Sequence, residues 1–121
     1  MVLVIDDDDG VRDAILDVLC AEQVDVRGVG SASEAFAYLG SNPPPRLILL
    51  DQVLPDMPGT QIRERLLADP ELAAVPVVLM SASSAVDQEG ACRALAGRLR
   101  KPFNMEALLG VVRPFATGKS A

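Results

Sequence analysis

The sequence predicts a single α/β domain in which a strand and a helix alternate five times, (βα)5, to give a doubly wound parallel sheet. The chain has 121 residues, of which 50% are hydrophobic and 23% charged, a balance typical of one globular domain. Short, continuous apolar runs alternate with stretches whose apolar residues recur at helical spacing. Continuous apolar runs indicate strands buried on both faces, which requires helices on both sides of the sheet.

Five short runs are the expected strands. They are Val2–Ile5, Val24–Val29, Leu47–Leu50, Val75–Met80 and Arg98–Arg100. The second run contains Asp25 and Arg27, and these charges favour a place at the edge of the sheet.

Five helices are expected between and after these strands. They are Val11–Ala21, a helix from Ser31 through Leu39, one from Pro58 through Leu67, Ala85–Ala96, and one from Asn104 through Val112. Ser31 and Glu34 form a capping-box pattern, and Asn104 is a suitable N-cap. Asp69-Pro70 is expected to end the third helix, and Pro114 to disturb the end of the last one.

Charge and composition exclude several classes of protein. The net charge is −6, which argues against non-specific binding of nucleic acid. Residues 1–92 carry 16 acidic and 5 basic side chains, whereas residues 93–121 carry 6 basic and 1 acidic. No apolar run approaches the roughly 20 residues of a membrane span, and acids follow the apolar start at once, so we expect neither a membrane segment nor a signal peptide. A cytoplasmic location is the corresponding expectation.

The cysteines and the missing histidines restrict metal chemistry. Cys20 and Cys92 lie far apart in two expected helices, where we interpret them as small apolar packing residues rather than a disulfide or metal pair. Since the chain has no His, a metal site must use oxygen ligands. Oxygen ligands favour Mg²⁺, Mn²⁺ or Ca²⁺ over Zn²⁺.

Polar residues follow the expected strands at the ends where α/β sheets bind ligands. Asp6-Asp7 follows the first strand, Asp51 the third, Ser81 the fourth and Lys101 the fifth. Crowded carboxylates repel one another, and a divalent cation relieves that repulsion and can bridge them to a phosphoryl group. Asp51 could then act as a nucleophile toward phosphorus, with Lys101 and Ser81 binding phosphoryl oxygens. Singly, the Asp6–Asp9 run could be only a solvated loop with a helix N-cap, Asp51 could cap a turn, Ser81 could cap the next helix and Lys101 could be a surface charge.

Four segments in this order resemble the signature segments of bacterial response-regulator receiver domains (CheY-like). They are VLVIDDDDGVR, LILLDQVLPDMPG, VVLMSA and RKPF. The resemblance covers roughly residues 2–115, and the order and spacing are far more specific than any one segment. It implies the flavodoxin-like strand order 2-1-3-4-5, with a receiver domain over residues 1–116 and a tail or the start of a linker over 117–121.

The resemblance also implies a role for each residue of the site. Asp51 would be phosphorylated from a phosphohistidine of a sensor histidine kinase or a histidine phosphotransfer protein. Mg²⁺, or Mn²⁺, would be bound by Asp7 directly, by Asp6 mainly through water, by Asp51, and by the backbone carbonyl of Val53. Ser81 would be the switch hydroxyl and Lys101 would form a salt bridge to the phosphoryl group. Pro102 would follow a cis peptide bond.

One departure concerns the way the signal leaves the site. Arg98 stands where the family usually has an aromatic switch residue, and RALAG, residues 93–97, replaces the usual Gly-Ala motif. The implied output surface, formed by helix 85–96, strand 98–100 and helix 104–112, would bind a downstream domain or protein, and a homodimer stays open as an alternative. We expect no direct contact with nucleic acid or membrane.

Two alternatives remain beside a phosphorylated switch. A degenerate receiver would bind its partner whether phosphorylated or not; Arg98 mildly favours this, and the intact Asp7, Asp51, Ser81 and Lys101 argue against it. The second alternative is an aspartate-nucleophile phosphohydrolase. Such enzymes typically have a second Asp where this chain has Val53, which argues against this alternative. A dinucleotide-binding enzyme is excluded because no G-x-G-x-x-G follows the first strand. We therefore expect a signalling switch rather than an enzyme.

Overall fold

The computed structural model describes residues 1–81, 97–101 and 103–116. Its centre is a five-stranded parallel sheet in the order β2-β1-β3-β4-β5, as expected. The strands are β1 (Val2–Ile5), β2 (Val26–Val29), β3 (Leu47–Asp51), β4 (Val77–Ser81) and β5 (Gly97–Arg100). The helices are α1 (Asp9–Ala21), α2 (Ala32–Ser41), α3 (Gly59–Ala68) and α4 (Met105–Ala116). The expected helix Ala85–Ala96, with Cys92, lies outside the described residues, as does Pro102.

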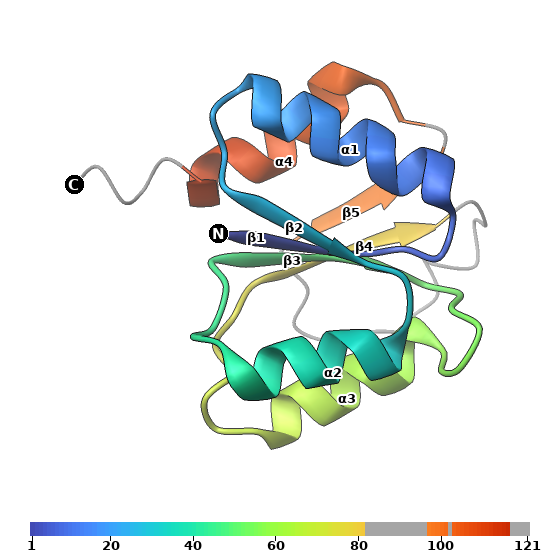
Figure 1. Ribbon diagram of the computed structural model, residues 1–121, viewed down its shortest axis with the longest axis vertical. Helices are drawn as coiled ribbons and strands as arrows, with labels where there is room; N and C mark the ends of the chain where they lie inside the picture. The colour runs from blue at the N-terminus through green and yellow to red at the C-terminus, as the bar shows by residue number, and fades with distance from the viewer. Residues whose placement is uncertain (82–96, 102, 117–121) are drawn as a thin grey trace.

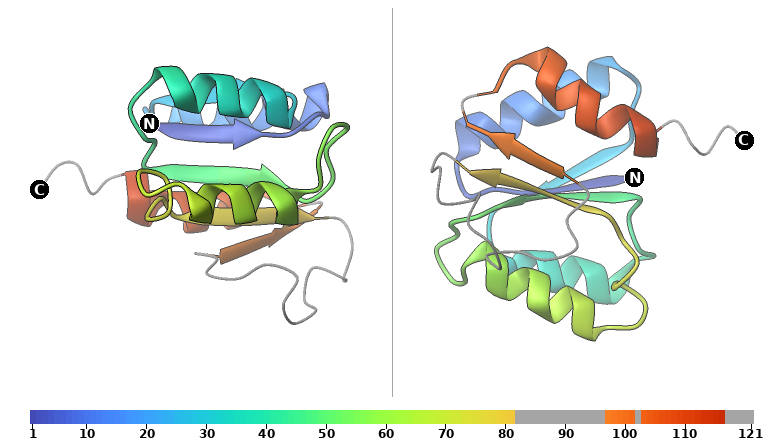
Figure 2. Two further views of the ribbon diagram at one scale, coloured as in Figure 1. Left: turned by 90° about the horizontal axis from the view of Figure 1, so that it is seen from below. Right: turned by 180° about the vertical axis from the view of Figure 1, so that it is seen from behind.

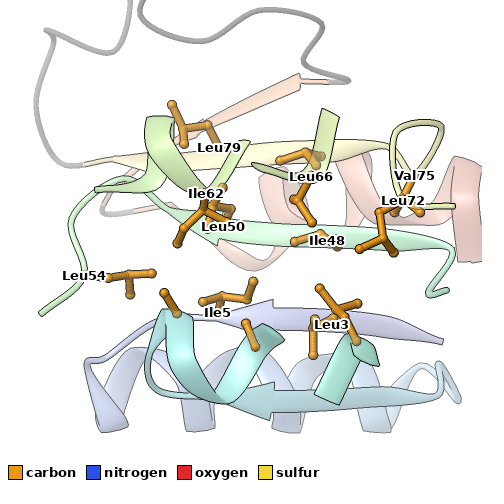
Figure 3. Packing of buried hydrophobic residues seen from close by; sticks show 14 residues of the cluster. Leu3, Ile5, Ile48, Leu50, Leu54, Ile62, Leu66, Leu72, Val75 and Leu79 are labelled. Carbon is orange, nitrogen blue, oxygen red and sulfur yellow. The ribbon is translucent and has the colours of Figure 1, made fainter. Parts of the chain in front are cut away.

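Helices cover both faces of the sheet. Figures 1 and 2 show α1 and α4 together on one face and α2 and α3 on the other. Successive strand residues point to opposite faces, so each strand contributes to two apolar clusters. Leu3, Ile5, Ile48, Leu50 and Leu79 pack toward α2 and α3 (Figure 3). Val2, Val4, Leu47, Leu49, Val78 and Met80 pack toward α1 and α4. This two-sided burial explains why the strands read as continuous apolar runs.

Two strands begin later than the apolar runs suggested. β2 begins at Val26 rather than Val24 because the Val24 N–H is still bound to the Leu19 carbonyl at the end of α1, at 2.9 Å. β4 begins at Val77 rather than Val75 because the Val75 N–H bonds to Leu72 in the preceding turn. In both cases local hydrogen bonds take backbone groups that a strand would need.

The helix ends confirm the expected caps and correct three boundaries: α1 begins at Asp9 rather than Val11, α2 ends at Ser41 rather than Leu39, and α4 ends at Ala116 rather than Val112. The Ser31 hydroxyl accepts from Glu34 N at 3.2 Å, and Asn104 Oδ1 accepts from Ala107 N at 2.8 Å. α4 does not end near Val112 but continues through Pro114 to Ala116. The bond that Pro114 cannot donate would go to the Gly110 carbonyl, and Gly110 is exposed, so water can take its place.

The packing role expected for Cys20 is wrong. This thiol is exposed on α1 rather than part of either apolar cluster. The buried residues of this helix are Ile15 and Leu19.

Candidate functional site

The carboxyl edge of the sheet brings the predicted polar residues together. Asp6 follows β1, Asp51 ends β3, Ser81 ends β4 and Lys101 follows β5. The Lys101 N–H donates to the Ser81 carbonyl at 2.8 Å, which extends the pairing of β4 with β5 by one residue. Parallel pairing of these strands is therefore the reason that residues up to 95 positions apart form one site.

Three carboxylates form a cluster at this edge. Asp6, Asp7 and Asp51 each place one carboxylate oxygen within 4.8 Å of the other two. Asp6 is fully buried, Asp51 is 7% exposed and Asp7 is exposed. A compact set of carboxylate oxygens beside solvent suits a hard divalent cation such as Mg²⁺ or Mn²⁺. These residues thus fit the metal site expected from the sequence.

Lys101 lies between two of these carboxylates. Its Nζ is 2.9 Å from Asp6 Oδ2 and 3.5 Å from Asp51 Oδ1. Burial lowers the pKa of Lys101, but the hydrogen bond to Asp6 and the charges of Asp51 and Asp6 outweigh it, so the pKa lies above its usual value. Lys101 therefore stays charged at neutral pH.

The pKa of Asp51 moves the other way from that of an ordinary salt-bridged carboxylate. Burial raises this pKa first and the charge of Asp6 raises it further, while Lys101 and the Val53 N–H, 3.4 Å from Asp51 Oδ1, lower it. The result is a pKa of about 6, against an ordinary value of 3.8. Lys101 does not offset burial and the charge of Asp6, so a cation at the cluster would stabilise the ionised form of Asp51.

Asp6 is held in place from several sides. Its Oδ1 accepts from the Asp8 N–H at 2.9 Å, and its backbone carbonyl accepts from Arg12 Nη1 at 2.9 Å. Arg12 also binds Asp9 at 2.6 Å. A Cβ at Gly28 would lie 3.1 Å from the Arg12 side chain, so this glycine leaves the room that the arginine needs. Sequence reasoning missed Arg12, whose position in VLVIDDDDGVR was the available signal.

Asp8 explains part of the aspartate run in another way. Its side chain accepts from Val11 N at 3.1 Å and caps α1. The alternative that these acids only cap a helix is thus correct for Asp8, while Asp6 and Asp7 join the cluster.

A tight loop after β3 fixes the backbone next to Asp51. The Gly59 N–H, at the start of α3, donates to the Gln52 carbonyl at 2.6 Å. A Cβ at Gly59 would lie 2.6 Å from the Asp51 carbonyl oxygen and 2.8 Å from Gln52 Cα. Only glycine permits this approach, a requirement that the sequence pattern did not reveal.

Asp56 attaches the same loop to α2. Its two carboxylate oxygens accept from Ala32 N at 3.0 Å, Ser33 N at 2.9 Å and the Ser33 hydroxyl at 2.8 Å. The bonds from these N–H groups are the main cause of a lowered pKa for Asp56. Sequence reasoning missed this contact as well.

Ser81 is buried, with 3% of its surface exposed, and its hydroxyl donates to the side-chain carbonyl of Gln52. Val53 is 71% exposed. The role of its backbone carbonyl as a metal ligand stays a prediction. The backbone of Arg98 pairs with Leu79 in the sheet, but its side chain lies outside the described part of the structure.

This geometry agrees with the comparison to known families. The sequence model of the response regulator receiver domain matches residues 2–113. The chain belongs to this family. The two-component response regulator ORR5 of Oryza sativa subsp. japonica is 31% identical over 91 residues, which cover 75% of this chain and 68% of that protein. RpaA of Synechocystis, a DNA-binding transcriptional regulator, is 31% identical over 114 residues, or 93% of this chain and 47% of that protein.

Solved structures show the same receiver fold. The chemotaxis response regulator CheY4 of Vibrio cholerae has a TM-score of 0.86 at 22% identity, over 94% of this chain and 96% of that one. The Mn²⁺-bound form of the response regulator Rcp1 has a TM-score of 0.83 at 23% identity, over 97% and 94%. This chain is therefore a receiver domain of a two-component response regulator and acts as a signalling switch.

Among the described helices, none combines the length and apolarity needed to cross a membrane.

Proposed function

We propose that this receiver domain accepts a phosphoryl group on Asp51. The observation that carries the proposal is a buried carboxylate at the carboxyl edge of the sheet, clustered with two further carboxylates and 3.5 Å from the Lys101 ammonium. Close to neutral pH Asp51 is mostly ionised, which a nucleophile requires. Asp6 already uses both carboxylate oxygens, on Asp8 N and on Lys101, which leaves it a supporting role.

The donor in this proposal is a phosphohistidine of a sensor histidine kinase or a histidine phosphotransfer protein. A carboxylate oxygen of Asp51 attacks phosphorus and the P–N bond breaks. The electron pair stays on the imidazole nitrogen, and the ring takes one proton from solvent to leave as neutral imidazole. The product is an acyl phosphate on Asp51.

The cluster residues would hold Mg²⁺ or Mn²⁺ during this step. Asp7 and Asp51 are the direct carboxylate ligands in the proposal, Asp6 acts mainly through water, and the Val53 carbonyl completes the set. The ion would neutralise charge on the phosphoryl oxygens. Lys101 Nζ lies 3.5 Å from Asp51 Oδ1, and in the proposal it binds a phosphoryl oxygen. Ser81 would supply a hydroxyl to another oxygen.

The proposed unit comprises residues 1–116, with residues 117–121 as a tail or the start of a linker. We place the reaction in the cytoplasm. The output would leave through the surface formed by helix 85–96, strand 98–100 and helix 104–112, to a downstream domain or protein. A phosphorylation-independent receiver is less favoured, since Asp6, Asp7, Asp51 and Lys101 converge on one edge.

Incubation with acetyl phosphate tests the proposal by intact mass. With Mg²⁺ we expect one added phosphoryl group, and with EDTA none. Asp51→Asn should remain unmodified, whereas Asp56→Asn, which changes an exposed carboxylate in the following loop, should be modified like the wild type. Equal modification of Asp51→Asn and the wild type would contradict the proposal.

A further inference from the structure

Gln52 follows the proposed phosphorylation site and contacts the proposed switch hydroxyl. The Ser81 Oγ–H donates to Gln52 Oε1 across the ends of β3 and β4. Ser81 is buried and Gln52 is half-buried, so the bond is shielded from competing water. The contact therefore decides where the Ser81 proton points before phosphorylation.

The backbones on both sides of this bond are fixed. Asp51 pairs with Met80, so Gln52 lies directly opposite Ser81. The Gln52 N–H donates to the Met80 carbonyl at 2.9 Å, and the Gln52 carbonyl accepts from Gly59 at 2.6 Å. The Ser81 carbonyl accepts from Lys101 N at 2.8 Å. Because these backbone bonds hold both residues, the two side chains can exchange hydrogen-bond partners without a break in the sheet.

A serine hydroxyl has one proton to donate. A phosphoryl group on Asp51 presents oxygens that would accept that proton, and the Gln52 carbonyl oxygen already accepts it. The two bonds exclude each other, so Ser81 must leave Gln52 in order to bind the phosphoryl group.

We propose that Gln52 is a positioning residue that holds Ser81 in the unphosphorylated arrangement and thereby opposes switching. This inference rests on the proposed function. Loss of the Gln52 acceptor removes a bond from the unphosphorylated state alone, and such a bond changes an equilibrium by roughly 3- to 10-fold.

The test compares the affinity for beryllofluoride, a phosphoryl mimic, at saturating Mg²⁺ and measured by calorimetry. Gln52→Met keeps the length of the side chain and removes its amide acceptor. We expect this variant to bind the mimic about 3- to 10-fold more tightly than the wild type. Gln61→Met, the same change at an exposed position in α3, should bind like the wild type.

The dependence on Ser81 separates this role from a general structural one. Ser81→Ala should bind the mimic more weakly, and adding Gln52→Met to Ser81→Ala should then change nothing. If Gln52→Met raised the affinity for beryllofluoride equally with Ser81 and with Ser81→Ala, or raised it in neither protein, the inference would be overturned. Failure of the wild type to bind beryllofluoride with Mg²⁺ is a different result, because it would overturn the proposed function itself.

Unfolding in denaturant gives an independent measurement. Without the mimic, the double-mutant cycle of Gln52→Met and Ser81→Ala should show a coupling of about 3- to 10-fold in the unfolding equilibrium constant. With beryllofluoride bound, the coupling should disappear because Ser81 has changed partner. A coupling that is unchanged by the mimic would contradict the inference.

Discussion

Two aspartates of the same loop region, Asp51 and Asp56, have opposite environments. Asp51 is buried beside Asp6, and its pKa is raised to about 6. Asp56 is exposed and accepts three hydrogen bonds from the start of α2, and its pKa is lowered. The residue type is identical and the positions differ by five in sequence, so the difference comes from burial and from the supply of donors.

This difference separates a structural carboxylate from a reactive one. The carboxylate of Asp56 accepts three hydrogen bonds from Ala32 and Ser33, and these bonds attach the loop to α2. The charge of Asp51 is buried against another acid and only partly compensated by Lys101. Such a carboxylate destabilises the folded protein when it is ionised. A bound cation would stabilise its charge, and phosphorylation would convert it to an acyl phosphate.

The largest effect is expected from removing the positive charge of Lys101 at the carboxyl edge of the sheet. Lys101→Met leaves the buried Asp6 without its ion-pair partner, so the free energy of unfolding should fall by about 2–4 kcal/mol without metal. Saturating Mg²⁺ should restore part of the loss. Arg113→Met, at an exposed pair with Glu22 at 3.3 Å, should cost less than about 1 kcal/mol in urea denaturation. Equal losses would contradict the account.

The pH dependence of stability should differ between the two aspartates. The folded pKa of Asp51 lies above its unfolded value of 3.8, so its contribution is present below 3.8 and is lost as the pH rises through about 6. In EDTA the wild type should lose up to about 3 kcal/mol relative to Asp51→Asn between about pH 4 and pH 7. Urea midpoints over this range measure the difference. A constant difference between the two proteins would show that Asp51 is not perturbed.

Gly59→Ala should disturb the backbone at Asp51. The added Cβ would meet the Asp51 carbonyl at 2.6 Å, so we expect a loss of about 1–3 kcal/mol in the free energy of unfolding and slower phosphorylation. Gly110→Ala is the matched control, since nothing lies within 4 Å of the new Cβ and alanine favours a helix. This control should be as stable as the wild type or more stable. Equal stability of both variants would refute the close contact.

The smallest effect is expected at Asp56. Asp56→Ala should lower the thermal midpoint slightly at neutral pH, because the N–H groups of Ala32 and Ser33 at the start of α2 lose their carboxylate acceptor. The pKa of Asp56 is lowered, so its contribution is present above the unfolded pKa and is lost as the pH falls through the folded value. The wild type and variant should therefore converge in acid, the opposite trend to Asp51. Phosphorylation of the variant by acetyl phosphate should persist.

The apolar runs predicted a parallel sheet and the edge at which the site forms, and the resemblance to receiver domains implied the strand order. Continuous runs such as Leu47–Leu50 are diagnostic because burial on both faces leaves no polar alternation. Asp6, Asp7, Asp51 and Lys101 could be placed together because parallel strands all end at one edge. The packing role of Cys20 was predicted wrongly, because an apolar residue type does not determine which face of the helix it lies on.

Contacts made by loops were beyond sequence reasoning. The bonds of Asp56 to α2 and of Gln52 to Ser81 depend on the path of residues 52–58, which the close approach of Gly59 fixes. The segment LILLDQVLPDMPG contains these residues, but neither its apolar pattern nor the resemblance assigned a contact to Gln52, Asp56 or Gly59. These are also the residues that surround Asp51, so the structure adds most where the chemistry is proposed to occur.

Direct mapping of the modified residue tests the central claim. Sodium borohydride reduces an acyl phosphate to an alcohol, which marks the acceptor permanently for peptide mass spectrometry. After treatment with acetyl phosphate and Mg²⁺, we expect the reduced side chain at position 51 and at no other aspartate. Reduction at Asp6, Asp7 or Asp56 with position 51 unmodified would contradict it.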